Sequence, residues 1–203
     1  MKHIHLPVAL AVATAFCFGQ AKANDFTYNY VSALYAQTND RDSDFDPNGF
    51  SLMGGFALGD TMYVRSAFSS GSDSNSFLGQ GVKIEVSGYA AYVGYRMPVS
   101  GQTEAVAEVG AGRSQVKSSV AGMSASESFT SFGAVLGLNH VFNSSFEGGV
   151  LTHYSRANKG TGSIVTVDFS GRYKMTERFH LVAHYSWSDV KVDNYALGIS
   201  YAF

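Results

Sequence analysis

The sequence predicts an all-β protein, a closed antiparallel β-barrel that spans a membrane, with ten strands. Three observations predict this fold. Apolar residues alternate with small or polar ones over runs of roughly ten residues from residue 26 onward, and a period of two indicates strands with two unlike faces. Polar breaks of alternating length separate these runs, as in transmembrane barrels. In addition, 14 % of the residues are aromatic, and 22 glycines stand against 3 prolines, which favours strands and turns.

The first 23 residues are expected to be a cleaved secretory signal peptide. A basic start precedes an apolar run over residues 6–18, and small residues follow in the A-x-A pattern that places cleavage between Ala23 and Asn24. The apolar run is shorter than the ~20 residues that a membrane-spanning helix needs. We therefore expect two segments, a signal peptide at 1–23 and a single barrel domain at 24–203.

Charge and cysteine content exclude several classes of protein. Cys17 is the single cysteine and lies in the expected signal, so the exported chain has no disulfide to stabilise it. Without Lys2 and Lys22 the chain carries a mild excess of acidic residues, which argues against a nucleic-acid partner. The sequence contains no phosphate-binding loop, dinucleotide fingerprint or zinc-ligand spacing, and we expect no cofactor.

The alternating runs define the expected strands in order. Each run approaches or exceeds the ~9–11 residues that a tilted strand needs to cross a bilayer. The expected strands are 26–37, 49–59, 61–70, 82–97, 103–117, 128–142, 146–155, 163–175, 179–190 and 193–203.

The breaks between strands indicate which end of the barrel faces outward. Transmembrane barrels have short periplasmic turns and longer extracellular loops. Short breaks fall at 59–61, 98–102, 143–145 and 176–178, whereas longer or more polar ones fall at 38–48, 71–81 and 118–127, with smaller ones near 156–162 and 190–193. An even number of strands then places both termini on the periplasmic side.

The two faces of each run are assigned by polarity. In the run 179–190, one face is apolar and is expected to meet lipid, and the other carries histidines and serines and is expected to line the lumen. A soluble barrel would show the same alternation, but the signal peptide, the loop asymmetry and the aromatic strand ends favour a membrane barrel. Small residues on the lumen face leave room for Arg65, Tyr92 and Arg96, so that side chains fill the narrow interior.

Charged residues on the lumen face form the main candidate cluster. Opposite charges should pair there, because an unpartnered buried charge costs several kcal/mol. The favoured interpretation is a structural plug of ion pairs, and the alternative is a gated path for small ions. The expected mid-barrel residues are Arg65, Glu108, Asp168 and His184, and those nearer the periplasm are Arg96, Glu104, Glu147, Arg172 and Lys174.

The end of the chain carries a family resemblance. Apolar residues occupy every second place and an aromatic residue comes last: Tyr195, Leu197, Ile199, Tyr201 and Phe203. This pattern resembles the C-terminal signal that the barrel assembly machinery recognises in Gram-negative outer-membrane proteins. Together with the opening residues 26–31 and strands such as Val93-Gly94-Tyr95, the chain resembles small outer-membrane barrels of the OmpA and OmpX type and, more loosely, the Ax21-like proteins. That resemblance implies eight strands as the alternative to ten.

A second resemblance concerns catalysis. His153 and Ser155 flank a tyrosine in a pattern similar to the His-x-Ser site of lipid A 3-O-deacylases. A nucleophilic serine needs a base within hydrogen-bond reach and an acid that orients the base. At the acid's place stands Val167, with Asp168 beside it on the other face. A second His-Tyr-Ser at 184–186 indicates that both are ordinary strand sequence.

The acidic stretch 40–46 spaces its carboxylates at every second residue, as oxygen ligands for Ca²⁺ could be. An EF-hand loop counted from Asp42 would need Gly at its sixth and Glu at its twelfth place, where Pro47 and Met53 stand. A solvated acidic loop is the favoured interpretation, and a weak divalent-cation site is the alternative.

The sequence therefore predicts a monomeric, non-enzymatic protein of the Gram-negative outer membrane. We expect a structural or surface-interaction role carried by the loops at 38–48, 71–81 and 118–127. Its expected partners are outer-membrane lipid, lipopolysaccharide and the barrel assembly machinery, with no nucleic acid. The alternatives are a narrow channel for small solutes or ions and a lipid A-modifying enzyme of the deacylase type.

Overall fold

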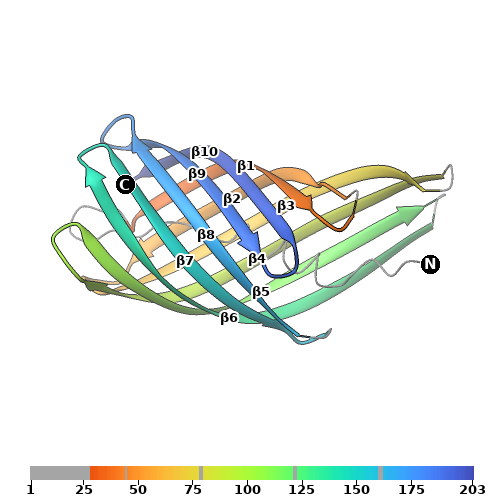
Figure 1. Ribbon diagram of the computed structural model, residues 1–203, viewed down its shortest axis with the longest axis horizontal. Coiled ribbons are helices and arrows are strands. Elements are labelled where there is room, and N and C mark those ends of the chain that lie inside the picture. Colours follow the sequence, from red (N-terminus) through yellow and green to blue (C-terminus); the bar gives the residue numbers. More distant parts are fainter. Residues whose placement is uncertain (1–27, 44, 78–79, 121–122, 160–161) are drawn as a thin grey trace.

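The computed structural model describes residues 28–203 except 44, 78–79, 121–122 and 160–161. Over these ranges the chain forms ten strands that close into one antiparallel barrel (Figure 1). The strands are β1 (Tyr30–Asp40), β2 (Asn48–Ala57), β3 (Met62–Phe77), β4 (Gln80–Pro98), β5 (Thr103–Val120), β6 (Met123–Asn143), β7 (Phe146–Ala157), β8 (Ser163–Lys174), β9 (Phe179–Ser188) and β10 (Val192–Ala202).

The expected all-β barrel with ten strands is confirmed, and the eight-strand alternative was wrong. The expected signal segment 1–23, with its cleavage between Ala23 and Asn24, lies outside the described residues. So does the expected strand start at Phe26. In the described part of the chain, no helix combines the length and apolar character needed to cross a bilayer.

The barrel closes where β1 pairs with β10. The pairing runs from Tyr30 opposite Ala202 to Asp40 opposite Val192. Beyond it, the Phe203 backbone N–H donates to the Asn29 carbonyl over 3.1 Å. Closure removes the open sheet edge, whose unpaired backbone groups would be costly in lipid.

Two of the expected external loops were wrong, because residues 71–81 and 118–127 largely continue the strands. β3 and β4 pair as far as Phe77 with Gln80, and β5 and β6 pair as far as Val120 with Met123. Serine clusters resemble loops in a sequence. Here, however, the serines occupy alternate positions on one strand face, which is compatible with continued pairing.

Side chains alternate strictly between the lumen and the outside. In β1 each residue from Tyr30 to Asp40 is in turn buried or exposed. Outward-facing aromatic residues form an outer girdle, which neighbouring strands bring to one level: Tyr35, Phe50, Phe68, Tyr89, Phe132, Tyr154, Tyr185 and Tyr195. Aromatic girdles mark the interfaces of a membrane barrel, so this ring places the outer surface of the bilayer.

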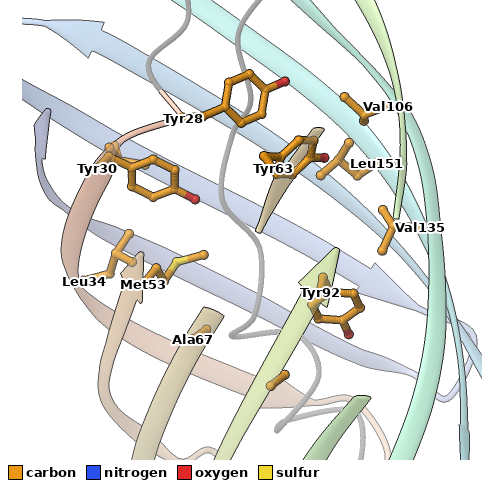
Figure 2. Packing of buried hydrophobic residues seen from close by; sticks show 12 residues of the cluster. Tyr28, Tyr30, Leu34, Met53, Tyr63, Ala67, Tyr92, Val106, Val135 and Leu151 are labelled. Atoms are coloured by element: carbon orange, nitrogen blue, oxygen red, sulfur yellow. The ribbon is translucent and has the colours of Figure 1, made fainter. Parts of the chain in front are cut away.

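Side chains fill the lumen in two packed layers. Figure 2 shows the inner layer, in which Tyr28, Tyr30, Tyr63 and Tyr92 project inward among aliphatic side chains. Glycines on neighbouring strands accommodate these rings. A Cβ at Gly94 would lie only 2.2 Å from Cζ of Tyr63, the residue opposite it. The second layer also lies in the lumen, nearer its outer mouth. It is an apolar cluster made by Ala36, Ile84, Val86, Phe129, Ile164 and Val192.

The strands end at two different heights outside the membrane. β4 continues from Tyr89 in the girdle to Gln80, roughly 30 Å along the strand, whereas β9 ends at Ser188, roughly 10 Å beyond Tyr185. Figure 1 shows the β3–β4 and β5–β6 hairpins reaching past the other strand ends. We call the part of β3–β6 beyond the girdle, residues 70–77, 80–87, 115–120 and 123–128, the protruding sheet.

Candidate functional site

An ion pair between β3 and β5 occupies the middle of the lumen. Arg65 pairs with Glu108, and both side chains are at most 2 % exposed. The Tyr63 hydroxyl donates to Glu108 Oε1 over 2.6 Å, and the Arg65 guanidinium lies 5.1 Å from the centre of the Tyr92 ring. Each charge is thus compensated where it is buried, as a low-dielectric interior requires.

Two further pairs line the opposite wall of the lumen. Arg172 lies 3.1 Å from Glu147 on the adjacent strand and covers the Tyr30 ring at 5.3 Å. His184 Nδ1 lies 3.4 Å from Asp168 Oδ1. These contacts join β7, β8 and β9 through side chains in addition to their backbone hydrogen bonds.

A third polar cluster lies at the periplasmic end. The Tyr28 hydroxyl donates to Glu104 Oε1 over 2.8 Å, and Asn139 Nδ2 donates to the same oxygen over 3.2 Å. The Arg96 guanidinium lies 4.2 Å from the centre of the Tyr28 ring and donates to the Gly59 carbonyl. Tyr28 precedes β1, so this cluster ties the start of the described chain to the barrel wall.

The structure therefore places eight of the nine expected lumen charges on the lumen side of the barrel, whereas Lys174 at the end of β8 is exposed. It brings Arg65 together with Glu108 and Asp168 together with His184, while Arg96 and Arg172 contact other partners. Sequence reasoning missed the hydroxyl donors Tyr28 and Tyr63. The alternation already assigned Tyr63 to the same strand face as Arg65, which was the available signal.

The outer mouth of the lumen is closed by the apolar cluster. Phe45 from the β1–β2 connection and Val190 from the β9–β10 turn pack against it. In the same region the Thr38 hydroxyl donates to Asn194 Oδ1 over 2.7 Å, and Asn194 Nδ2 donates to Ser186 Oγ. The lumen thus combines a charged middle with an outer end where an apolar cluster lies beside hydrogen-bonded polar side chains.

The residues of the expected deacylase pattern face away from lipid. The side chains of His153 and Ser155 point into the barrel, and these residues are 4 % and 5 % exposed, while Tyr154 between them points outward. Asp168 also points inward and contacts His184. A serine that attacks an acyl ester of a membrane lipid must be reachable from the bilayer, so this geometry does not favour the deacylase alternative.

The carboxylates of the acidic β1–β2 connection accept hydrogen bonds from nearby groups or form ion pairs. Asp40 accepts from the Asp42 backbone N–H and the Ser43 hydroxyl, and Asp46 accepts from the Asp40 N–H. Asp42 pairs with Lys191 at 3.0 Å. Among the described residues, which omit Asp44, no group of three His, Cys, Asp or Glu side chains is arranged to hold a metal ion.

The expected assembly signal lies along the outside of β10. Its side chains alternate with lumen residues, and all of them point outward: Tyr195, Leu197, Ile199, Tyr201 and Phe203. Neighbouring rings on β9 pack against them, with Tyr185 5.2 Å from Tyr195 and Phe179 5.2 Å from Tyr201 between ring centroids. Recognition of this stripe by the assembly machinery remains a prediction.

The protruding sheet has two unlike faces. Its outward face presents rows of polar side chains in register: Ser70, Ser87, Gln115 and Ser128; Ser72, Glu85, Lys117 and Ser126; Ser74, Lys83, Ser119 and Ser124. Hydrogen bonds and ion pairing with Lys83 and Lys117 hold the pKa of Glu85 below its ordinary value. The inward face is mixed. Val82, Ile84, Val86 and Val116 belong to the apolar cluster or pack against it over the mouth. The residues opposite them include the polar Asp73, Asn75, Ser118 and Glu127.

In the described part of the chain, both edges of the protruding sheet lack a partner strand over part of their length. On the β3 edge, pairing with β2 ends at Asn48 opposite Ser72. β7 pairs with β6 only from Ala157 opposite Ser131, and Asn158 hydrogen-bonds both backbone groups of Thr130. In the described part of the chain, no strand pairs with that side of β6 over 123–129. A free strand edge offers backbone donors and acceptors to an extended segment of another molecule.

Comparison with known proteins gives a family match and several similar folds. The model of the outer membrane protein beta-barrel domain matches residues 8–203. Among solved structures, the translocator domain of the autotransporter NalP from Neisseria meningitidis is 14 % identical, with a TM-score of 0.55, covering 86 % of this chain and 87 % of that one. The attachment invasion locus protein Ail of Yersinia pestis is 18 % identical, with a TM-score of 0.46, covering 86 % and 95 %. No curated protein matches the sequence. At these identities the structural likenesses concern the fold alone.

Proposed function

The chain belongs to the outer membrane protein β-barrel domain family and resides in the Gram-negative outer membrane, and on this premise we propose that it is a surface-recognition protein. In this proposal the barrel is an anchor with a filled lumen. The protruding sheet is the part that meets an external partner.

The extension of β3–β6 past the outer girdle carries the proposal. Crossing the bilayer requires only ~9–11 residues per strand, yet β6 runs from Met123 to Asn143. The additional length lies outside lipid and presents a polar outward face. It also presents the strand edge at 123–129, which suits addition of an extended segment from a partner.

The packing of the lumen supports an anchor over a transport path. Arg65 and Glu108 neutralise each other in the middle, and Phe129 and Ile84 belong to the apolar cluster at the outer end. An ion that passed this apolar cluster would exchange water for side chains that cannot compensate its charge, which is unfavourable.

The test compares whole cells that express the full chain with cells that express a shortened one. Removing 73–84 and 118–125, and joining each pair of ends with an Asn-Gly turn, shortens both hairpins while keeping the strand register. We expect the full chain to increase adhesion to surfaces coated with extracellular proteins or glycans, and the shortened chain to lose this increase. Heat-modifiable mobility in gels checks that both barrels fold.

Equal adhesion by the full and shortened chains would overturn the role of the protruding sheet. Adhesion no greater than that of cells without the protein would overturn surface recognition altogether and leave a structural role.

A narrow channel is the second candidate, favoured by the charged side chains that line the lumen from Arg96 to Asp168. Planar-bilayer recordings of the purified barrel separate the two functions. The surface-recognition proposal expects no resolved conductance steps. Regular steps that respond to Glu108→Gln would instead favour the channel.

A further inference from the structure

Two arginines lie on the outside of the barrel at the outer edge of the outer girdle. Arg113 on β5 is opposite Tyr89 on one side and Thr130 on the other. Arg156 on β7 is opposite Phe132 of β6. Both side chains are exposed on the outward face, and neither points into the lumen.

The neighbours of these arginines fix their level in the membrane. The next outward residues toward the periplasm are Ala111 and Tyr154, and Gln115 follows Arg113 on the other side. Apolar and aromatic side chains thus give way to polar ones at this position on both strands. Arg113 and Arg156 therefore lie where the hydrocarbon ends and the headgroups of the outer leaflet begin.

Four other cations at this end have acidic partners. Arg41 pairs with Asp193 at 3.3 Å, Lys191 pairs with Asp42 at 3.0 Å, and Lys83 and Lys117 share Glu85. In the described part of the chain, no carboxylate forms a salt bridge with Arg113 or Arg156. Lys159, exposed in the connection after β7, adds further positive charge nearby.

The backbone holds the two arginines in a fixed relation. Strand spacing and the two-residue offset across β6 put their Cα atoms roughly 12 Å apart, with Thr130 between them. Asn158 accepts from the Thr130 N–H over 3.0 Å and donates to its carbonyl over 2.8 Å, which fixes the end of β7 to β6. From this separation, two long arginine side chains can reach a common group above Thr130.

We propose that Arg113 and Arg156 form a clamp for a phosphate group of the lipid A portion of lipopolysaccharide. The planar guanidinium group binds phosphate with two parallel hydrogen bonds, which makes arginine well suited to such a site. The phosphorylated sugars of the outer leaflet lie at the level of these side chains, and their charge complements the two cations. The inference goes beyond the proposed function, because it concerns the surrounding lipid and not an external partner.

The test measures lipid A binding by the purified full-length barrel in a non-ionic detergent. The variant R113Q/R156Q removes both charges, and Arg41→Gln is the matched control, because it removes an exposed outward arginine that already has an acidic partner. We expect bisphosphorylated lipid A to bind at least tenfold more weakly to R113Q/R156Q than to the wild type and equally well to the control. R113K/R156K should bind with intermediate affinity, because lysine lacks the two-pronged geometry.

Two further ligands identify the source of the phosphate. Dephosphorylated lipid A should bind the wild type no more tightly than bisphosphorylated lipid A binds R113Q/R156Q. Inorganic phosphate at the same concentration should not displace bisphosphorylated lipid A from the wild type. The clamp is overturned if R113Q/R156Q keeps wild-type affinity with its heat-modifiable mobility intact, or if dephosphorylated lipid A binds as tightly as the phosphorylated form. Neither result bears on cell adhesion, so this proposal and the proposed function fail separately.

Discussion

Strands β3–β6 and strands β7–β10 carry the same outward band of apolar and aromatic side chains, but they end at different heights above it. On the lower side, which β7–β10 form, the strands end just above the girdle, and ion pairs such as Arg41–Asp193 lie at their ends. On the taller side, which β3–β6 form, the strands continue as the protruding sheet. There the outward positions hold mainly serine, where apolar residues stand within the bilayer. The comparison shows that lipid requires apolar residues on the outward face only within the bilayer. Beyond the bilayer, backbone hydrogen bonds between neighbouring strands are enough to continue the sheet.

The largest expected effect distinguishes the ion pairs of the two sides. Glu108→Ala leaves Arg65 deeply buried beside an empty site, which should lower the free energy of unfolding by about 3–5 kcal/mol. Glu147→Ala should cost less, because the Glu147 side chain is 13 % exposed and water can enter the space that it leaves beside Arg172. Urea titrations in lipid vesicles, followed by the fluorescence of the single tryptophan, Trp187, measure both values. An equal loss in the two variants would show that burial does not distinguish the pairs.

A smaller effect is expected where glycines accommodate tyrosine rings. Gly94→Ala on the taller side places a methyl group against Tyr63 and should cost about 1–3 kcal/mol through forced repacking. The control is Gly171→Ala on the lower side, where the nearest atom, in the ring of Phe146, would be 3.6 Å from the new Cβ. The same urea titration should find little change there. A loss as large as that of Gly94→Ala would contradict the assignment of Gly94 as a packing site for Tyr63.

The smallest effect concerns pH and is confined to the protruding sheet. The pKa of Glu85 is lowered below 4.5 in the folded chain, so its ion pairs are present above that pH and are lost as the pH falls through the folded pKa. The Glu85 side chain is 39 % exposed on the outward face, where water screens its ion pairs, so global stability should not change measurably. Nuclear magnetic resonance titration of the Glu85 carboxyl carbon should find a midpoint below 4.5, which K83Q/K117Q moves upward. An unchanged midpoint in that variant would rule out the lysines as the cause.

Much of the fold could be predicted from the sequence, because a period of two fixes both the strand and its faces. The ten strands, the closing seam at Phe203 and the inward direction of Arg65 and Asp168 all follow from that period. The outer part of the protruding sheet was missed because residues such as Ser72 and Ser74 count as turn residues until each is assigned to a strand face. Outside the membrane, serine alternates with other polar residues and not with apolar ones, so the period of two that indicates a strand is not visible there.

The partners inside the lumen could be predicted only in part. Alternation shows that Arg65 and Glu108 share a face, but their contact depends on the relative register of β3, β4 and β5. Tyr28 lies in the expected strand 26–37, but its contact with Glu104 crosses the lumen, and alternation along one strand does not indicate such a contact. Arg113 and Arg156 were missed for a different reason, because their significance lies in the bilayer level, which appears only when the girdle is assembled.

Labelling of single cysteines tests the central claim most directly, namely that the sheet stands outside the cell on a membrane-embedded barrel. Cys17 lies in the expected signal, so a cysteine introduced into the exported chain would be its only thiol. A membrane-impermeant maleimide applied to intact cells should label Ser74→Cys and Ser124→Cys, and should label Ser100→Cys in the β4–β5 turn only after the cells are broken. Labelling of Ser100→Cys on intact cells, with Ser74→Cys and Ser124→Cys protected, would contradict the orientation and the surface position of the protruding sheet.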